Sequence, residues 1–436
     1  MSDIHIIGLG VTEQAHLSTI TEQALCNAEV VIGSERQLET VRRILDIPFH
    51  EVDKIPLPPL KELKGLLDSH TGKRIAILAS GDPLYYGIGR WLSQRFSQEQ
   101  LYFHPGVSSI QAACHSLGLS LQDTEVLSLH GRPLATLRRY LARHQYLIIL
   151  TDAHSTPQAL AKECQQAGFT DSTLWVCEKL GYPEQQIRQF TVDELACDNQ
   201  AITDTPSFDP LHVTIIKVQG RSNYLPSFPG IPDTDFITDS DAGKGLITKR
   251  EVRLSILSLL QPAPGDIGWD IGAGCGGVAV EWALWNPLGQ VHAIEHHRTR
   301  LCCLEQNRER FGVVNNLSAV AGRAPDILNE LPLANKIFIG GSDGELPGLL
   351  TSLWEKLPLG GVIVASAVME TTRSCLLQFT DKLQKNKQLG DVETLQVAVS
   401  RGSELAGQLL YRPALPVTLF KFTKHDNLNH LTRDTA

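Results

Sequence analysis

The fold of the second half of the chain is decided by residues 270–277, which read Asp-Ile-Gly-Ala-Gly-Cys-Gly-Gly. The stretch overlaps the end of a short apolar run, Ile267–Ile271, and precedes a helix-compatible pattern at residues 278–285. We therefore expect a strand, a glycine turn and a helix in this order. Glycines allow a sharp turn and a close approach of the backbone to a ligand, with amide donors at the helix N-terminus.

Two details indicate which ligand this turn would bind. Glu295 ends the next expected strand, where its carboxylate can accept hydrogen bonds from both hydroxyls of a ribose. Gly272, Gly274 and Gly277 also satisfy G-x-G-x-x-G, so a dinucleotide dehydrogenase is an alternative, as is a purely structural turn. However, Asp270 at the strand end suits the cationic amino-acid part of S-adenosylmethionine, whereas it would repel a pyrophosphate. We therefore prefer a methyl-donor site over a site for NAD.

The chain as a whole alternates short apolar runs with longer helical patterns, which is typical of α/β proteins. Residues 220–245 interrupt this alternation with turn-forming and extended segments that have no period. We therefore expect a first domain at residues 1–220, a linker at 221–245 and a second domain at 246–436. The second domain restarts with an expected helix at 251–260, which stops before Pro262.

Bulk composition agrees with a two-domain protein of the cytoplasm. The 436 residues exceed one ordinary domain, and the net charge of -9 would repel nucleic acid and anionic lipid. The nine cysteines contain no C-x-x-C pair, which fits a reducing compartment and gives no zinc spacing. We find neither a signal peptide nor an apolar run of membrane-spanning length, so we expect no membrane partner and no metal.

Motifs in the second half resemble one family. Residues 248–253 (Thr-Lys-Arg-Glu-Val-Arg), the glycine turn, residues 322–326 (Gly-Arg-Ala-Pro-Asp) and residues 339–346 (Ile-Gly-Gly-Ser-Asp-Gly-Glu-Leu) follow one another as in precorrin C-15 methyltransferase domains, which also decarboxylate. The resemblance implies a Rossmann-like class I methyltransferase fold with a seven-stranded sheet. The residues that it implies for S-adenosylmethionine binding are Thr248, Gly272, Ala273, Gly274, Cys275, Gly276, Glu295 and Ala324. Ser366 stands where many relatives have Asn, and we expect it to tune substrate contact.

Motifs in the first half resemble a second, unrelated family. Residues 80–83 (Ser-Gly-Asp-Pro), 104–110 (His-Pro-Gly-Val-Ser-Ser-Ile) and 177–182 (Cys-Glu-Lys-Leu-Gly-Tyr) are similar to the tetrapyrrole methylases, above all to their precorrin C-5 methyltransferase branch. The resemblance implies a two-lobed class III methyltransferase fold with the cofactor in the cleft between the lobes. It places Gly81, Asp82, Pro83, Ser108 and Ser109 along that cleft. Relatives commonly continue the first glycine turn as G-L-G-P-G, whereas residues 8–12 here read Gly-Leu-Gly-Val-Thr.

Because it combines these two families in this order, the chain resembles the fused decarboxylating C-5,15-methyltransferases of corrin biosynthesis. They imply two S-adenosylmethionine sites per chain and a tetrapyrrole substrate, either a precorrin or a cobalt-precorrin. We also expect a homo-oligomer without a nucleic-acid partner. Two alternatives stay open: only one domain is catalytic while the other is a binding or scaffolding module, or the first domain methylates another substrate. No residue stands out as a catalytic nucleophile, acid or base.

Two further patterns have plain structural explanations. His296 and His297 follow Glu295, but neighbouring residues at a strand end point apart, so we expect solvated rim residues rather than a metal pair. Arg132, Arg138, Arg139 and Arg143 form a basic run, for which we prefer a solvated helix face over a binding surface for substrate carboxylates.

Overall fold

The computed structural model describes residues 3–12, 15–44, 52–197, 206–241, 245–342, 344–385 and 391–425. The chain forms two compact units, and each is described by itself. Unit 1 comprises Met1–Leu134 and His144–Arg221, and unit 2 comprises Ala135–Arg143 and Ser222–Ala436. Residues 242–244 of the expected linker and Asp343 of the 339–346 motif lie outside the described residues.

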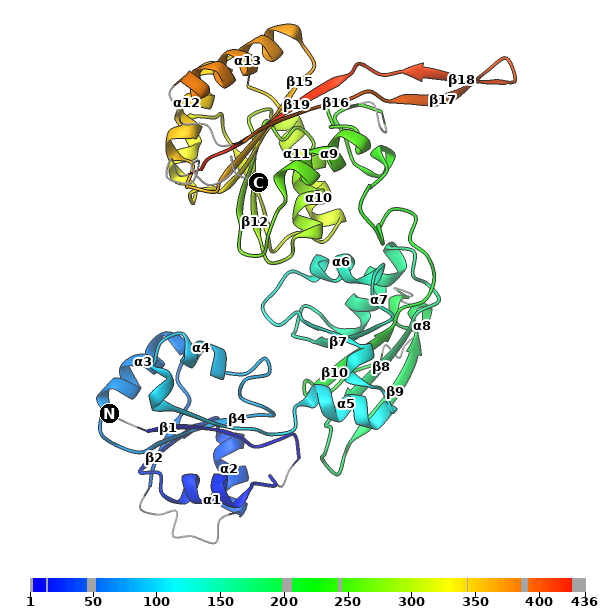
Figure 1. Cartoon of the computed structure of the whole chain (residues 1–436). Coiled ribbons are helices and arrows are strands. Elements are labelled where there is room, and N and C mark those ends of the chain that lie inside the picture. The colour runs from blue at the N-terminus through cyan, green and yellow to red at the C-terminus, as the bar shows by residue number, and fades with distance from the viewer. Residues whose placement is uncertain are drawn as a thin grey trace, which may run out of the picture. The chain divides into compact units, whose positions relative to one another are not determined.

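The first lobe of unit 1 (residues 3–104) is a parallel five-stranded sheet with helices on both faces (Figure 1). Its strand order is β3-β2-β4-β1-β5. Successive residues of one strand face opposite sides, so Ile6 packs with the α3 and α4 side and Ile7 with the α1 and α2 side. The elements are β1 (Ile4–Gly8), α1 (Thr19–Cys26), β2 (Val30–Gly33), α2 (Glu35–Ile44), β3 (Asp53–Pro56), α3 (Leu60–Ser69), β4 (Ile75–Ala79), α4 (Gly89–Ser93) and β5 (Leu101–His104).

The second lobe of unit 1 (residues 109–217) is a mixed sheet in the order β6-β7-β10-β8-β9. β6 and β7 are parallel, whereas β10 runs antiparallel to both of its neighbours. One face of this sheet packs against α5 through Ile110, Ala113 and Cys114. The elements are α5 (Ser109–Leu117), β6 (Glu125–Ser128), β7 (Tyr146–Leu150), α7 (Pro157–Gln166), β8 (Thr173–Glu178), β9 (Gln186–Thr191), α8 (Val192–Ala196) and β10 (His212–Lys217).

Unit 2 is built on a seven-stranded sheet in the order β13-β12-β11-β14-β15-β19-β16. The strands from β13 to β15 are parallel, and β19 is antiparallel to both of its neighbours. In Figure 1, α9, α10 and α11 cover one face and α12 and α13 cover the other. The strands are β11 (Ile267–Ile271), β12 (Gln290–Glu295), β13 (Leu317–Ala321), β14 (Lys336–Ile339), β15 (Val362–Ala367), β16 (Val392–Val397) and β19 (Val417–Thr423). The helices are α9 (Arg250–Leu260), α10 (Gly277–Trp285), α11 (Arg298–Arg310), α12 (Leu346–Lys356) and α13 (Glu370–Lys385).

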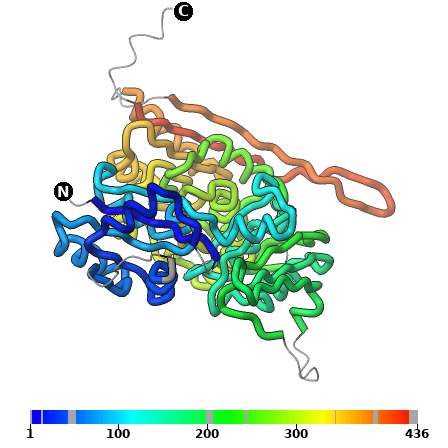
Figure 2. The backbone as a smooth tube through the Cα atoms, turned by 90° about the horizontal axis from the view of Figure 1, so that it is seen from below, coloured from blue at the N-terminus to red at the C-terminus, as the bar shows by residue number. Residues whose placement is uncertain are grey.

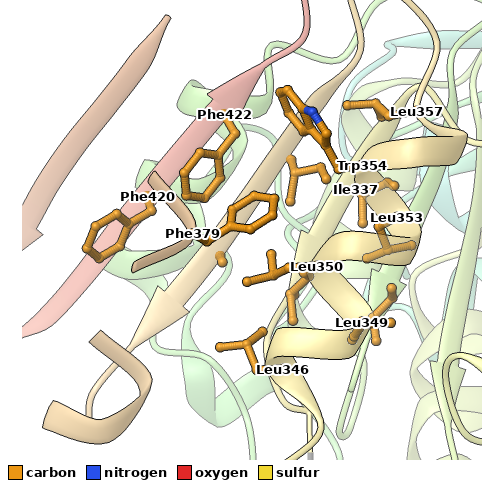
Figure 3. Packing of buried hydrophobic residues seen from close by; sticks show 14 of the residues in the cluster. Ile337, Leu346, Leu349, Leu350, Leu353, Trp354, Leu357, Phe379, Phe420 and Phe422 are labelled. Atoms are coloured by element: carbon orange, nitrogen blue, oxygen red, sulfur yellow. The ribbon is translucent and has the colours of Figure 1, made fainter. Parts of the chain in front are cut away.

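The apolar core beneath α12 and α13 shows why the sheet and these helices pack together. Figure 3 shows the side chains of α12 directed at the sheet and Phe379 of α13 lying beside Phe422 of β19. The rings of Phe379 and Phe422 meet edge to face with centroids 5.3 Å apart. Aromatic pairs in this geometry add to the free energy gained by burying apolar area.

A β-hairpin extends from the sheet of unit 2, and the sequence did not predict it. β17 (Ser400–Leu405) and β18 (Gln408–Pro413) pair with each other and lie between β16 and β19 in the chain. Figures 1 and 2 both show the hairpin projecting from the rest of unit 2. Its turn residues Ala406 and Gly407 have φ values of 52° and 76°, as in a two-residue turn of type I′.

The stretch before α9 is packed onto unit 2 rather than extended from it. Ile231 and Phe236 are buried, and the guanidinium of the fully buried Arg253 donates to Asp233 Oδ1 at 2.7 Å and to Glu281 Oε2 at 3.0 Å. Buried charges need such partners, so this network fixes the chain that enters α9.

The fold classes expected for both halves are confirmed: two α/β lobes in the first half, and a seven-stranded sheet in the second. The strand, turn and helix expected around residues 270–277 are β11, the glycine turn and α10. The helix expected at 251–260 is α9, which ends at Leu260 as predicted.

Candidate functional site

Each unit contains a pocket at the carboxyl ends of parallel strands. The first pocket, in unit 1, is an open cleft with a volume of about 1020 Å³ and is lined by residues of both lobes. Of the residues implied for the first domain, Gly81, Asp82, Ser108 and Ser109 line this pocket. Pro83 is buried and does not line it.

Three turns meet at the floor of the first pocket, and their glycines permit the close approach. A Cβ atom on Gly8 would lie 2.6 Å from the carbonyl oxygen of Gly81 and 2.8 Å from the amide nitrogen of Gly106. The Gly81 amide donates to the Gly10 carbonyl at 2.9 Å, and Leu9, Gly10, Val11 and Thr12 line the pocket. The first turn therefore takes part in the pocket, although its sequence departs from G-L-G-P-G.

Asp82 and Ser108 have local structural duties as well as a place at the pocket. Asp82 Oδ1 accepts hydrogen bonds from the amides of Leu84 (2.8 Å) and Tyr85 (3.1 Å). Ser108 is the N-cap of α5: its Oγ accepts from the Gln111 amide at 3.1 Å, and the Gln111 side chain accepts from the Ser108 amide at 2.9 Å. Within these contacts Asp82 keeps one carboxylate oxygen for another partner.

Several polar residues of the first pocket were missed by the sequence interpretation. Arg36 and Gln37, at the start of α2, both donate to Ser80 Oγ, at 3.1 and 3.0 Å. His212 Nε2 lies 2.9 Å from Thr151 Oγ1, and both residues line the pocket from the second lobe. Their positions depend on pairing between distant strands, so no local motif marks them.

The second pocket, in unit 2, is an open cleft with a volume of about 1230 Å³ above the carboxyl ends of the parallel strands. Among the residues implied for the second domain, those that line it are Thr248, Gly272, Ala273, Gly274, Glu295 and Ala324. Cys275 and Gly276 do not line it. The buried Cys275 thiol instead lies 3.7 Å from Asp239 Oδ1, and burial raises the pKa of this thiol to about 12.

Glu295 is held at the second pocket by backbone donors. Only 4% of it is exposed; Oε2 accepts from the Gly274 amide and Oε1 from the His297 amide, both at 2.8 Å. A carboxylate has about four lone-pair sites, so each oxygen can accept one more hydrogen bond. The Glu295 carboxylate can therefore accept hydrogen bonds from the two hydroxyls of a ribose.

Two glycines of the turn are required by backbone geometry. Gly272 and Gly274 have φ values of 72° and 59°. A Cβ atom would lie 2.8 Å from the Gly341 amide nitrogen in the first case and 2.7 Å from the Leu246 carbonyl oxygen in the second. Any side chain here would displace the backbone that walls the pocket.

Asp270 is not placed as its sequence position suggested. It is 1% exposed, does not line the second pocket, and neither carboxylate oxygen has a hydrogen-bond partner among the described residues. Burial raises the pKa of Asp270 from 3.8 to about 7, and the Glu295 carboxylate acts in the same direction. A direct contact between Asp270 and a ligand ammonium group therefore finds no support in the pocket lining.

The second pocket also contains cationic and small polar residues that the glycine motif does not reveal. These are Lys249, His296, Arg300, Arg323, Ser342 and Ser366. Arg300 Nε donates to Asp239 Oδ2 at 3.0 Å. His296 and His297 are both exposed, as expected of rim residues, and the described residues contain no group of three His, Cys, Asp or Glu side chains placed to hold a metal ion.

The prediction that the basic run forms a solvated helix face is wrong for Arg139. This residue is 5% exposed in unit 2, where its guanidinium donates to the carbonyls of Ala283 and Leu284 and to Asn316 Oδ1, all at 3.1 Å. Both carbonyls belong to the last turn of α10, whose acceptors are unpaired within the helix. Arg139 therefore caps a helix rather than facing solvent.

Comparisons with known proteins agree with this two-part organisation. Residues 3–196 match the tetrapyrrole (corrin/porphyrin) methylases, and residues 240–424 match the precorrin methyltransferase domain. The precorrin-6Y C(5,15)-methyltransferase (decarboxylating) of a Sinorhizobium species is 32% identical over 421 residues, which cover 96% of this chain and 96% of the relative. The protein of that name from Mycobacterium tuberculosis is 34% identical over 424 residues, covering 97% and 100%.

A shorter relative matches part of the chain only. A probable cobalt-precorrin-6B C(15)-methyltransferase (decarboxylating) of Pyrobaculum calidifontis is 34% identical over 177 residues, which cover 40% of this chain and 85% of the relative. Among the residues that the structure describes, no helix is long and apolar enough to cross a membrane.

With both halves matched and full-length relatives above 30% identity, the chain belongs to the decarboxylating precorrin-6Y C(5,15)-methyltransferases, S-adenosylmethionine-dependent C-methyltransferases of cobalamin biosynthesis.

Proposed function

We propose that both units are catalytic and that each binds its own S-adenosylmethionine. Unit 1 methylates the tetrapyrrole at C-5, and unit 2 methylates it at C-15 and removes the carboxyl group of the ring C acetate. The observation that carries this proposal is the presence of two separate pockets, each lined by most of the residues that its family motif implies. A chain with one catalytic domain would need only one such pocket.

In unit 2, individual residues at the pocket match individual parts of S-adenosylmethionine. Glu295 offers acceptors for the ribose hydroxyls, and the turn at Gly272–Gly274 brings backbone close to the ligand. Thr248 and Ala324 complete the wall. In unit 1, the partly exposed Asp82 and the N-terminus of α5 at Ser108 and Ser109 line the pocket that we assign to the donor.

S-adenosylmethionine supplies an activated methyl group, so the chain itself mainly has to align the donor with the substrate carbon. Methyl transfer is an in-line displacement, and holding both reactants in that geometry while excluding water supplies most of the acceleration. The nucleophile is a carbon of the conjugated tetrapyrrole, which is why no side-chain nucleophile is required. The same macrocycle can accept the electron pair released by decarboxylation, so no further cofactor has to be invoked.

Cationic side chains at the second pocket suit a substrate that carries carboxylates. Lys249 and Arg323 line this pocket together with the small polar Ser342 and Ser366. A carboxylate near a cation is stabilised, whereas decarboxylation is favoured where the carboxylate is poorly solvated. We therefore assign the cations to carboxylates that remain in the product, and the apolar wall at Leu349, Val368 and Val417 to the one that is lost.

We further propose that the chain forms a homo-oligomer. The hairpin of unit 2 exposes Leu405, Leu409 and Tyr411, and a two-stranded hairpin is marginally stable alone. Light scattering on the purified chain tests this expectation, because a monomer at micromolar concentration would contradict it.

Mass spectrometry of the products tests the division into two activities. Purified full-length chain is incubated with precorrin-6Y and excess donor. We expect two methyl groups gained and one carbon dioxide lost per product. A product with one methyl group at complete conversion would show that one unit is a non-catalytic module.

A further inference from the structure

The two lobes of unit 1 are joined by one short covalent connection. Strands β1 to β5 form the first sheet and β6 to β10 the second, and the chain passes between them at residues 105–108. Lobes connected in this way move relative to each other unless other contacts hold them. The first pocket is lined from both lobes, so its width depends on such contacts.

The loop at residues 82–89 is built to hold one tyrosine in an unusual backbone conformation. Asp82 Oδ1 binds the amides of Leu84 and Tyr85, and the Gly89 amide donates to the Pro83 carbonyl at 2.8 Å. A Cβ atom on Gly87 would lie 2.5 Å from that same carbonyl oxygen. Between these fixed points Tyr86 has a φ of 56°, which is unfavourable for a residue with a large side chain.

Tyr86 spans the two lobes at the edge of the first pocket. Its Oη donates to the carbonyl oxygen of Val126 at 3.0 Å, and Val126 lies in β6 of the second lobe. Tyr86 also lines the pocket and packs edge to face on Tyr85, with ring centroids 5.3 Å apart. Backbone strain that persists next to a pocket is typical of residues that preorganise a site.

We propose that Tyr86 is a strut that sets the distance between the two lobes across the first pocket, and thereby positions donor and substrate for the methyl transfer of unit 1. It is a positioning residue, because its hydroxyl binds protein backbone. The kinetic part of this proposal rests on the function proposed for unit 1. The mechanical part concerns the lobes alone.

The mechanical part is tested without substrate, by measuring the distance between spin labels on the full-length chain. Labels are placed at exposed positions of the two lobes, Lys61→Cys on α3 and Gln165→Cys on α7. The exposed native cysteines are first replaced by serine; these are Cys26, Cys197 and Cys302. We expect Tyr86→Phe, which removes only the hydroxyl, to broaden the distance distribution. Tyr102→Phe, at an exposed tyrosine of β5 that does not line the first pocket, should leave it unchanged. An unchanged distribution in Tyr86→Phe would overturn the proposal.

The kinetic part is tested with saturating donor and separate quantification of the C-5 and C-15 methyl groups. Losing one hydrogen bond that fixes the geometry should lower kcat for C-5 methylation roughly three- to tenfold, with little change in the KM for the donor. C-15 methylation and Tyr102→Phe serve as controls, and neither should change.

Tyr86→Gly separates positioning from simple stability. Glycine adopts a φ of 56° without strain, so this variant should unfold at no lower temperature than Tyr86→Phe. Its C-5 kcat should nevertheless be lower still. Unaltered C-5 kcat in Tyr86→Gly would contradict the proposal. If the unmodified chain made no C-5 methyl product while the labels still showed the broadening, the function proposed for unit 1 would fail and the strut would stand.

Discussion

The two pockets hold their acidic residues in opposite ways. Asp82 of the first pocket is partly exposed, lies on a loop of the first lobe that faces the second, and uses one oxygen to fix that loop. Glu295 of the second pocket is almost fully buried at the end of a strand and binds one backbone amide with each oxygen. A site between lobes depends on what holds the lobes, whereas a site on one sheet is rigid from the start.

The largest effect is expected from filling one pocket while leaving the other intact. Gly274→Trp places a bulky side chain where even a Cβ atom meets the Leu246 carbonyl, so the second site should be lost. Calorimetric titration with the donor should show two sites in the unmodified chain and one in this variant. Gly348→Ala is the control, because nothing lies near a Cβ at that glycine. One site in the unmodified chain would remove the basis of the comparison.

A smaller loss is expected when the buried carboxylate loses its charge. Glu295→Gln should weaken donor binding at the second site at least tenfold, since hydrogen bonds to a charged acceptor contribute about 1.5–3 kcal/mol. Binding at the first site should not change. The control is Glu305→Gln, an exposed acid of α11 that pairs with Arg308. Equal affinities for Glu295→Gln and the unmodified chain would mean that Glu295 does not bind the ribose.

Stability should respond to pH with opposite signs at two aspartates, one in each unit. The pKa of Asp270 is raised from 3.8 to about 7, so between these values the folded state binds more protons than the unfolded state. The contribution of Asp270 therefore becomes less favourable as pH rises from about 4 to 7 and is constant above. Asp152 of unit 1 accepts hydrogen bonds from the Gly131 and His154 amides, which lower its pKa. The contribution of Asp152 to stability is therefore lost as pH falls.

Denaturant unfolding at several pH values checks this contrast. Asp270→Asn should gain free energy of unfolding relative to the unmodified chain at pH 8 and much less at pH 4. Asp152→Asn should lose stability mainly at neutral pH. A pH-independent difference for Asp270→Asn would show that the Asp270 carboxyl is ionised in the folded chain throughout.

The smallest effect is expected at Ser366. Ser366→Asn exchanges one short polar side chain at the second pocket for another. The KM for the tetrapyrrole in C-15 methylation should shift about threefold or less, which corresponds to the range of mild substitutions. Donor affinity and C-5 methylation should stay the same. A loss of C-15 methylation would give Ser366 a larger role than tuning.

Features encoded by neighbouring residues were predictable from the sequence. The β11 strand, its glycine turn and α10 follow each other directly, so apolar pattern and glycine spacing identify them. The same holds for Glu295, which ends the next strand. These residues need only local geometry to reach the pocket.

Features that depend on distant partners were not predictable. Cys275 stands inside the glycine motif, yet its side chain turns to Asp239, which lies 36 positions earlier. Arg139 lies in a basic run that predicts a solvated face, but its hydrogen-bond acceptors are carbonyls at the end of α10. Tyr86 bonds a strand 40 residues away in another lobe. In each case the side chain follows a tertiary contact that the local pattern does not contain.

Carbon-13 NMR of products made with labelled donor tests most directly whether each pocket serves its own carbon. Asp82→Arg introduces bulk and positive charge that repels the sulfonium in the first pocket. Asp82→Asn keeps an oxygen for the loop amides and therefore controls for the structure of the loop, not for donor binding. We predict that Asp82→Arg yields a decarboxylated product labelled at C-15 alone, and that Gly274→Trp yields a product labelled at C-5 alone that retains its carboxyl group. Loss of decarboxylation in Asp82→Arg together with its retention in Gly274→Trp would contradict the assignment of the two activities to the two units.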